Sequence, residues 1–189
     1  MPVDDLIDPR VARTRRDVVD TAAHLLLESG WDAVTHGEVA RRASYSKATL
    51  YTHWPTPLDL IAAAIEQICS VDHHPVVSGD LRRDLQAALA DFAADLTTGH
   101  LDRLLAGVVE RASTSDVVRE LRGRLYATGT SSIRTILEAH LSPVDIEPAI
   151  SMLTGAVLVR VTFEGEQAGG AFIADLVERV LNSATEPVT

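Results

Sequence analysis

The chain has 189 residues, enough for one domain of ordinary size or for two small ones with a buried core. Apolar residues make up 46% and charged residues 23%, which predicts a soluble globular protein, and the single cysteine, Cys69, excludes an internal disulfide and fits a reducing cytoplasm. The net charge of −10 argues at first sight against a polyanionic partner, because phosphate attraction dominates the affinity of proteins for nucleic acids.

The N-terminal part predicts one long helix. Residues 1–8 are acidic and patternless, and no signal peptide is visible, so we expect a disordered tail. Apolar side chains then recur on one helical face from about Pro9 to Ser29, and Gly30 follows as a stop signal. That face is formed by Val11, Val18, Ala22, Leu25 and Leu26.

The segment from Thr35 to Pro57 predicts two short helices joined by a tight turn. Thr35 and Glu38 are expected to form a reciprocal capping box at the start of the first helix. Ser46 can cap the second helix, and Pro55 ends it. The outer surface of this second helix is small, hydroxylic or cationic, which suits phosphates and base edges. Its residues are Lys47, Ala48, Thr49, Tyr51, Thr52 and His53, and the pattern indicates a DNA-binding helix-turn-helix.

The charge distribution supports this interpretation more than the total does. Between Pro9 and Lys47 seven basic residues face five acidic ones, a local net charge of +2, whereas residues 48–189 hold ten basic and nineteen acidic residues, a net of −9. Such asymmetry indicates a DNA-facing N-terminal module on an acidic body. Lys47 is the sole lysine and opens the second helix, so we favour a phosphate or guanine contact over a merely solvated charge.

The remaining chain predicts further helices and no strand. One begins at Thr56, with Pro57 at its first position and Asp59 near its positive end. The others are expected from Leu81 to about Gly99, from Leu101 to Ala112, as a single long helix from Ser115 to Ser142, from Ile146 to about Glu164, and after Gly170.

The helix over 146–164 is apolar nearly all round, so we expect it to be buried, with cover on both sides. Its most apolar run is too short to span a bilayer of roughly 30 Å. Together with the last helix it forms a natural self-association surface, because a helical hairpin from each of two subunits can build a four-helix bundle.

At this point the residues resemble the tetracycline-repressor (TetR) family of transcriptional regulators. The resemblance covers roughly the first third of the chain, and a weaker similarity to one C-terminal subgroup runs from Gly155 to Phe172. It implies an all-α fold of about nine helices, with a helix-turn-helix DNA-binding domain at residues 1–55 and a ligand-binding and dimerisation domain at 56–189. The pattern consists of Ala22 to Gly30, Trp31, Val34, Thr35, Glu38, Val39, Ala40, Ala43, Ser46 to Trp54, and Leu58.

The resemblance also implies which positions touch DNA. The chain departs from the family pattern at Pro57, where many members have a phosphate-binding lysine, and at Ala48, where a glycine is usual. The arginines that open the first helix, Arg10, Arg13, Arg15 and Arg16, are our hypothesis for a compensating phosphate contact. The implied DNA-contacting positions are Thr35, His36, Tyr45, Ser46, Lys47, Ala48, Thr49, Tyr51, Thr52 and His53.

An effector pocket is expected in the C-terminal domain. For Arg160, a charge within an apolar helix, we favour a structural ion pair over an effector contact. Asp72, His73 and His74 lack a spaced third ligand, so we expect solvated side chains there, with no metal and no cofactor. The candidate pocket residues are Arg103, Glu110, Tyr126, His140 and Arg160.

The sequence therefore favours a cytoplasmic, ligand-responsive regulator, most simply a repressor that binds a palindromic operator as a homodimer and is released by a small-molecule effector. The alternatives are an enzyme, for which no nucleophile elbow, phosphate loop or spaced metal set is present, or a helical small-molecule-binding protein that keeps the motif without regulating genes.

Overall fold

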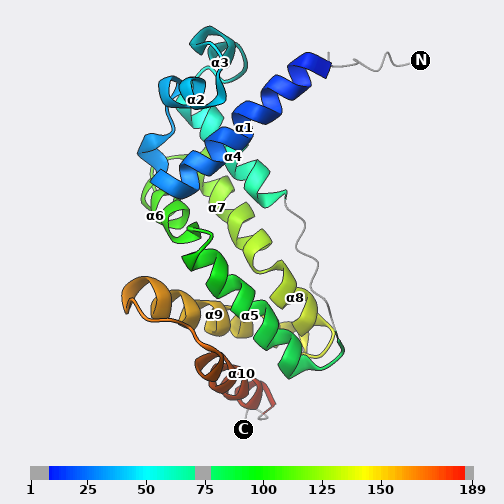
Figure 1. The fold of residues 1–189 in the computed structure, drawn as a ribbon. Coiled ribbons are helices and arrows are strands. Elements are labelled where there is room, and N and C mark those ends of the chain that lie inside the picture. The colour runs from blue at the N-terminus through cyan, green and yellow to red at the C-terminus, as the bar shows by residue number, and fades with distance from the viewer. Residues whose placement is uncertain (1–8, 71–77, 186–189) are drawn as a thin grey trace, which may run out of the picture. The chain divides into compact units, whose positions relative to one another are not determined.

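The computed structural model describes residues 9–70 and 78–185 of the chain (Figure 1). Within these ranges it contains helices and no strand, which confirms the all-α fold. The elements are α1 (Pro9–Ser29), η1 (Trp31–Ala33), α2 (His36–Ala43), α3 (Lys47–His53), α4 (Pro57–Cys69), α5 (Leu81–Thr97), α6 (Leu101–Arg111), α7 (Asp116–Gly129), α8 (Ser131–Glu138), α9 (Pro143–Leu158), η2 (Val159–Phe163) and α10 (Gly170–Thr185).

The described residues divide into two compact units. Unit 1 comprises 9–70 together with 103–122, and unit 2 comprises 78–102 together with 123–185. The units group residues that pack against one another, so α4 and most of α6 belong to the same unit as α2 and α3. The boundary between a DNA-binding and a ligand-binding domain that we expect at residues 55/56 remains a prediction.

In unit 1, α1 and α4 pack side by side, and α2 lies against α1 (Figure 1). The interior of the unit is aliphatic: Val18, Leu26, Leu60 and Ile65 are fully buried. The helix predicted from Pro9 to Ser29 is confirmed, and Gly30 ends it with a φ of 83°, a left-handed conformation that glycine adopts without strain.

A reciprocal capping box is present in unit 1, at the start of α4 and not at the start of α2, where we expected it. The Thr56 hydroxyl accepts from the Asp59 N–H at 3.2 Å, and the Asp59 carboxylate accepts from the Thr56 N–H at 2.8 Å, which makes a full box at α4. At α2, Thr35 does accept from the Glu38 N–H at 3.2 Å. The Thr35 N–H, however, donates to the Ala33 carbonyl, and nearby arginines engage the Glu38 carboxylate instead.

Helix α6 docks on η1 through a glycine. A Cβ placed on Gly107 would lie 3.1 Å from Trp31 Cβ and 3.2 Å from its Cε3, so the indole rests directly on the α6 backbone. Arg111, one turn further along α6, lies over the same ring at 5.1 Å and pairs with Asp32 at 2.9 Å. The two helices are therefore held by close packing reinforced with a cation–π contact.

The expectation of one long helix from Ser115 to Ser142 is wrong, because α7 ends at Gly129 and α8 starts at Ser131. The joint is Thr130, which is buried, has φ −105° and ψ −1°, and donates its hydroxyl to the Tyr126 carbonyl at 2.8 Å. Glycine and a β-branched residue in succession both disfavour a helix interior, which accounts for the break.

In unit 2, α5 contacts α8, α9 and α10 (Figure 1). A buried carboxylate orders the entry to α5: Asp84 accepts from the Ser78 N–H and the Gly79 N–H, each at 3.0 Å. The Ser78 hydroxyl donates to the same carboxylate. This hydrogen bond lowers the pKa of Asp84 most, and the two backbone N–H groups lower it further.

The apolar helix over 146–164 differs from expectation in its burial. The segment Pro143–Phe163 is long and apolar enough, by composition alone, to cross a membrane, and its 18-residue apolar window has a mean hydropathy of 1.4. One such helix is weak evidence for a membrane role. Of that window, 33% is buried inside the protein. The expectation that it is covered on both sides is therefore wrong for a single chain. Its last residues form the π-helical turn η2.

Candidate nucleic-acid interface

The helix-turn-helix is formed as predicted, with α2, a tight turn and α3 in sequence. Ser44 takes the left-handed conformation at φ 61°, and the Tyr45 N–H returns to the Ala40 carbonyl at 3.0 Å, which ends α2. The inner face of α3 is anchored by Leu50 and Trp54, both of which are buried. The rest of α3 is consequently free to face a ligand.

The outer face of α3 is exposed at Lys47, Ala48, Tyr51 and Thr52, whereas Thr49 and His53 are half-buried. Ser46 caps the helix, accepting from the Thr49 N–H at 3.1 Å. Small side chains beside a tyrosine and a lysine leave room for close approach to a duplex groove.

Tyr51 is held in place from beneath by His36. The two rings stack with centroids 4.1 Å apart and planes inclined by 23°, and Tyr51 still exposes 53% of its surface. His36 is buried, and its Nε2 lies 2.6 Å from the Trp54 carbonyl oxygen, which requires Nε2 to carry the proton and donate. We therefore replace the expected DNA contact of the His36 side chain with a supporting role, a correction that only its burial reveals.

Tyr45 is half-buried in the turn and donates its hydroxyl to the Asp17 carboxylate at 2.8 Å. This bond ties the turn to α1. A DNA contact by Tyr45 would thus use an oxygen whose proton is already engaged.

Two of the basic residues counted in the N-terminal module, Arg41 and Arg42, share one carboxylate. Glu38 accepts from Arg41 at 2.5 Å and from Arg42 at 2.8 Å, and Arg42 reaches Glu28 of α1 at 3.1 Å. The hydrogen bonds from Arg41 and Arg42 lower the pKa of Glu38 to about 2. Charge counting missed this network, although Glu38, Arg41 and Arg42 stand at helical i, i+3 and i+4 spacing.

The arginines at the start of α1 are exposed beside the motif. Arg15 lies over the Trp54 ring with its guanidinium carbon 5.9 Å from the centroid, which brings a cation next to the end of α3. Arg13 approaches Asp17 at 3.8 Å, a weak and largely exposed pair. The location of these arginines agrees with their proposed part in phosphate binding.

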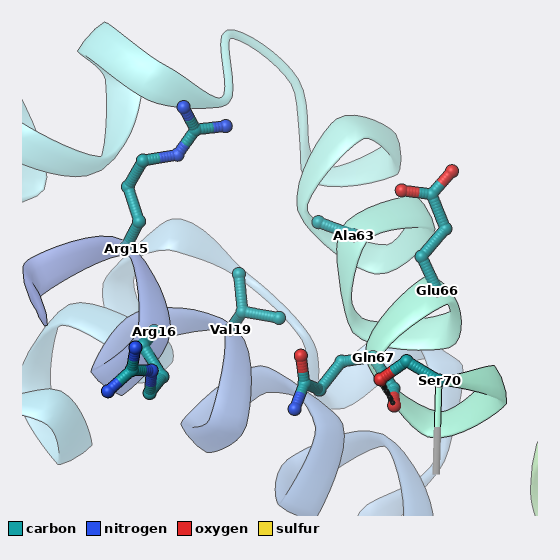
Figure 2. A pocket seen from close by; sticks show the side chains of 7 residues that line it. All are labelled: Arg15, Arg16, Val19, Ala63, Glu66, Gln67 and Ser70. Atoms are coloured by element: carbon teal, nitrogen blue, oxygen red, sulfur yellow. Dashed lines mark hydrogen bonds between the residues drawn. The ribbon is translucent and has the colours of Figure 1, made fainter. Parts of the chain in front are cut away.

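A hollow of about 400 Å³ lies between α1 and α4. Figure 2 shows Val19 on the α1 side and Ala63 on the α4 side, with Arg15 and Arg16 extending in different directions. Because the hollow is open and its two arginines diverge, we assign no ligand to it. Its lining consists of Arg15, Arg16, Val19, Ala63, Glu66, Gln67 and Ser70, and includes none of the candidate effector residues.

The five candidate effector residues fall into both units. In unit 1, Arg103 donates to the Glu28 carbonyl and Glu110 pairs with Arg111 at 2.5 Å. In unit 2, Tyr126 approaches Glu147 at 3.4 Å and His140 lies 3.0 Å from the Ile136 carbonyl. These four side chains make local structural contacts.

Arg160 pairs with Glu164 at 2.8 Å and lies over the Phe172 ring at 5.4 Å. The structural ion pair favoured by the sequence is therefore confirmed. Asp72, His73 and His74 lie outside the described residues, within which no cluster of potential metal ligands occurs.

The fold and this motif define a helix-turn-helix DNA-binding protein, and comparisons with known proteins specify its family. The family model described as bacterial regulatory proteins, tetR family, matches residues 18–64, and the model described as tetracyclin repressor-like, C-terminal domain, matches residues 75–180. The chain belongs to the TetR family of DNA-binding transcriptional regulators.

Individual relatives agree with this assignment. The HTH-type transcriptional regulator YdeS of Bacillus subtilis (strain 168) is 28% identical over 178 residues, covering 89% of this chain and 88% of its own. The crystal structure of the TetR family transcription regulator SCO0332 superposes with a TM-score of 0.67 at 27% identity, covering 93% of this chain and all of that one. The multidrug binding protein EbrR, complexed with proflavin, has the same fold, with a TM-score of 0.66 at 19% identity over 88% of this chain and 99% of its own.

Proposed function

We propose that this protein is a repressor that binds a palindromic operator as a homodimer and leaves it when a small molecule binds. The observation that supports the proposal most directly is the exposed face of α3, which carries Lys47, Tyr51 and Thr52 above an anchored inner face. Duplex DNA in the cytoplasm is the partner that such a helix fits, because an α-helix fills the major groove.

The proposed contacts divide into two kinds. Lys47 and the α1 arginines bind phosphates or guanine, while the Tyr51 ring and the small α3 side chains lie against base edges. His36 supports Tyr51 from within the protein. The proposed contacting residues are Thr35, Tyr45, Ser46, Lys47, Ala48, Thr49, Tyr51, Thr52 and His53.

The dimer is proposed to form through α9, η2 and α10. Met152, Val159 and Phe163 are exposed by 44, 46 and 82%, and their spacing of seven and four residues places them on one face of the continuous helical segment. An apolar face of this kind is covered most simply by the same face of a second copy, which a two-fold axis allows. That symmetry sets two α3 helices about 34 Å apart and makes the operator palindromic.

The effector belongs to the proposal in general terms. EbrR binds proflavin, and by analogy we propose an organic ligand of metabolite size for this chain. An aromatic content of 4% favours an aliphatic ligand over a flat stacking one. Effector contacts by Arg103, Glu110, Tyr126, His140 and Arg160 remain a prediction. The comparisons point to regulators and not to enzymes, so catalysis is not part of the proposal.

The proposal is tested by selecting bound duplexes from a random pool with the purified protein. We expect a two-fold symmetric site whose halves lie about one helical turn apart. Retention of unrelated sequences without a common symmetric site would contradict the proposal. A thermal-shift screen with lipophilic metabolites, with and without the selected duplex, then identifies compounds that stabilise the protein and release DNA. Turnover of such a compound would favour the enzyme alternative.

A further inference from the structure

The side chain of Lys47 lies across the first turn of α2. A Cβ placed on Gly37 would be 3.3 Å from Lys47 Cε and 3.4 Å from Lys47 Nζ. The first distance is tighter than ordinary van der Waals contact and the second lies at its edge, so a methyl group at position 37 would require the end of the lysine to shift by a few tenths of an ångström. Gly37 lies in the first turn of α2, and Lys47 begins α3.

The end of the Lys47 side chain lies beside Gly37 without an acceptor for its ammonium among the described residues. Lys47 is exposed, and no hydrogen-bonded or ionic partner for it is found among residues 9–70 and 78–185. A lysine without a partner samples many rotamers in solution, and ordering it on binding costs conformational entropy. The bare backbone of Gly37 provides a surface on which one extended conformation can rest.

Glycine at this position is otherwise unfavourable. Gly37 lies within the eight-residue helix α2 and does not have a positive φ, so the backbone does not require glycine. Glycine within a helix is less favourable than alanine, because it loses more conformational freedom on folding. The side chain that a Cβ at position 37 would meet most closely is Lys47.

We propose that Gly37 is a positioning residue for DNA binding, whose missing side chain lets Lys47 lie across α2 with its ammonium preset for the duplex. This inference rests on the proposed function, since it assigns the preset ammonium to the operator contact. It concerns a residue that makes no DNA contact of its own.

The test is Gly37→Ala, for which stability and affinity should change in opposite directions. The added methyl group improves helix propensity, so the melting temperature rises or stays level. The same methyl group pushes the end of Lys47 aside and removes the surface on which it rests, so affinity for the duplex selected by the wild-type protein falls about threefold to tenfold, and the slope of log K against log salt becomes shallower by up to about one. Unchanged affinity and slope in a folded Gly37→Ala protein would overturn the inference.

Two further variants separate this effect from a general one. Gly123→Ala is a matched control, because Gly123 is also helical and a Cβ there meets nothing within 4 Å. It should leave duplex affinity unchanged. In the background of Lys47→Ala, Gly37→Ala should cause no further loss, since its target is gone. Additive losses would show that Gly37 acts independently of Lys47 and would overturn the inference.

A measurement without DNA distinguishes failure of this inference from failure of the proposed function. Because Lys47 is the sole lysine, reductive methylation with ¹³C-formaldehyde labels its amine and the N-terminal amine, which resolve as separate NMR signals. The Lys47 signal should shift in Gly37→Ala and stay in place in Gly123→Ala. An unshifted signal overturns the positioning role even if DNA binds, whereas a shifted signal without a selected duplex supports the contact and contradicts the operator proposal alone.

Discussion

At the scale of single residues, binding depends on a few side chains that stay accessible. Arg41 and Arg42 are engaged with Glu38, and His36 is buried under Tyr51. The apparent surplus of positive charge near the motif is therefore smaller than the sequence count suggests, and Lys47 is the cation placed on α3 itself.

Lys47→Ala should weaken operator binding and make its salt dependence shallower by about one unit, because one phosphate-neutralising charge is lost. The melting temperature should change little, since the side chain is exposed. Fluorescence anisotropy with the selected duplex at several salt concentrations measures both quantities. Lys47→Arg, which keeps the charge, serves as the control, and wild-type affinity in Lys47→Ala would exclude the contact.

Glu38 should make stability depend on acidity. Its pKa falls from 4.5 to about 2 in the folded protein, so the ionised carboxylate stabilises the fold above about pH 4.5, and this stabilisation is lost as pH falls from 4.5 toward 2. Glu38→Gln should therefore show a flatter decline in the free energy of unfolding over that window. Urea denaturation at pH 5, 4 and 3 tests this, and parallel pH profiles for the two proteins would contradict it.

At the scale of elements, two glycines in helices have opposite surroundings. Gly107→Ala should lower the free energy of unfolding by about 1 kcal/mol or more, because the new methyl group meets the rigid indole of Trp31. Gly123→Ala should raise it by up to about 1 kcal/mol, because it gains helix propensity in open space. Chemical denaturation of both variants measures the difference, and stabilisation by Gly107→Ala would show that α6 can move away from η1.

Element boundaries were predictable where local chemistry marks them. Pro9 to Ser29, the turn before Ser46 and the Pro57 start were all correct, because caps, glycine and proline act within one turn of the chain. The break at Thr130 and the capping partner of Glu38 were missed. The break follows a glycine and a β-branched residue whose combined effect on the helix was underestimated. The capping partner of Glu38 depends on which of several competing hydrogen bonds forms, and Arg41 and Arg42 take the carboxylate.

At the scale of the whole molecule, the exposed apolar face of α9 and η2 predicts self-association. Phe163→Ser should shift the protein from dimer toward monomer at micromolar concentration, because its side chain is 82% exposed in one chain and removing it deletes apolar interface area. Binding to a palindromic duplex should weaken with it, since two half-sites are read together. Sedimentation velocity checks the first effect.

Val109→Ser is the matched control for this variant. Val109 is 63% exposed and lies on α6 in the other unit, so its loss should leave the oligomeric state unchanged. A monomeric wild-type protein, or a Phe163→Ser variant that remains fully dimeric, would show that the interface lies elsewhere.

The sequence by itself determined the helical class, the helix-turn-helix and the accessible face of α3, because these follow from periodicity, caps and the placement of apolar residues over short spans. The tertiary structure alone decided that His36 supports Tyr51, that Arg42 also reaches Glu28 of α1, and that Lys47 rests on Gly37. Those relations join residues on different turns or different helices, where distance along the chain carries no information about distance in space.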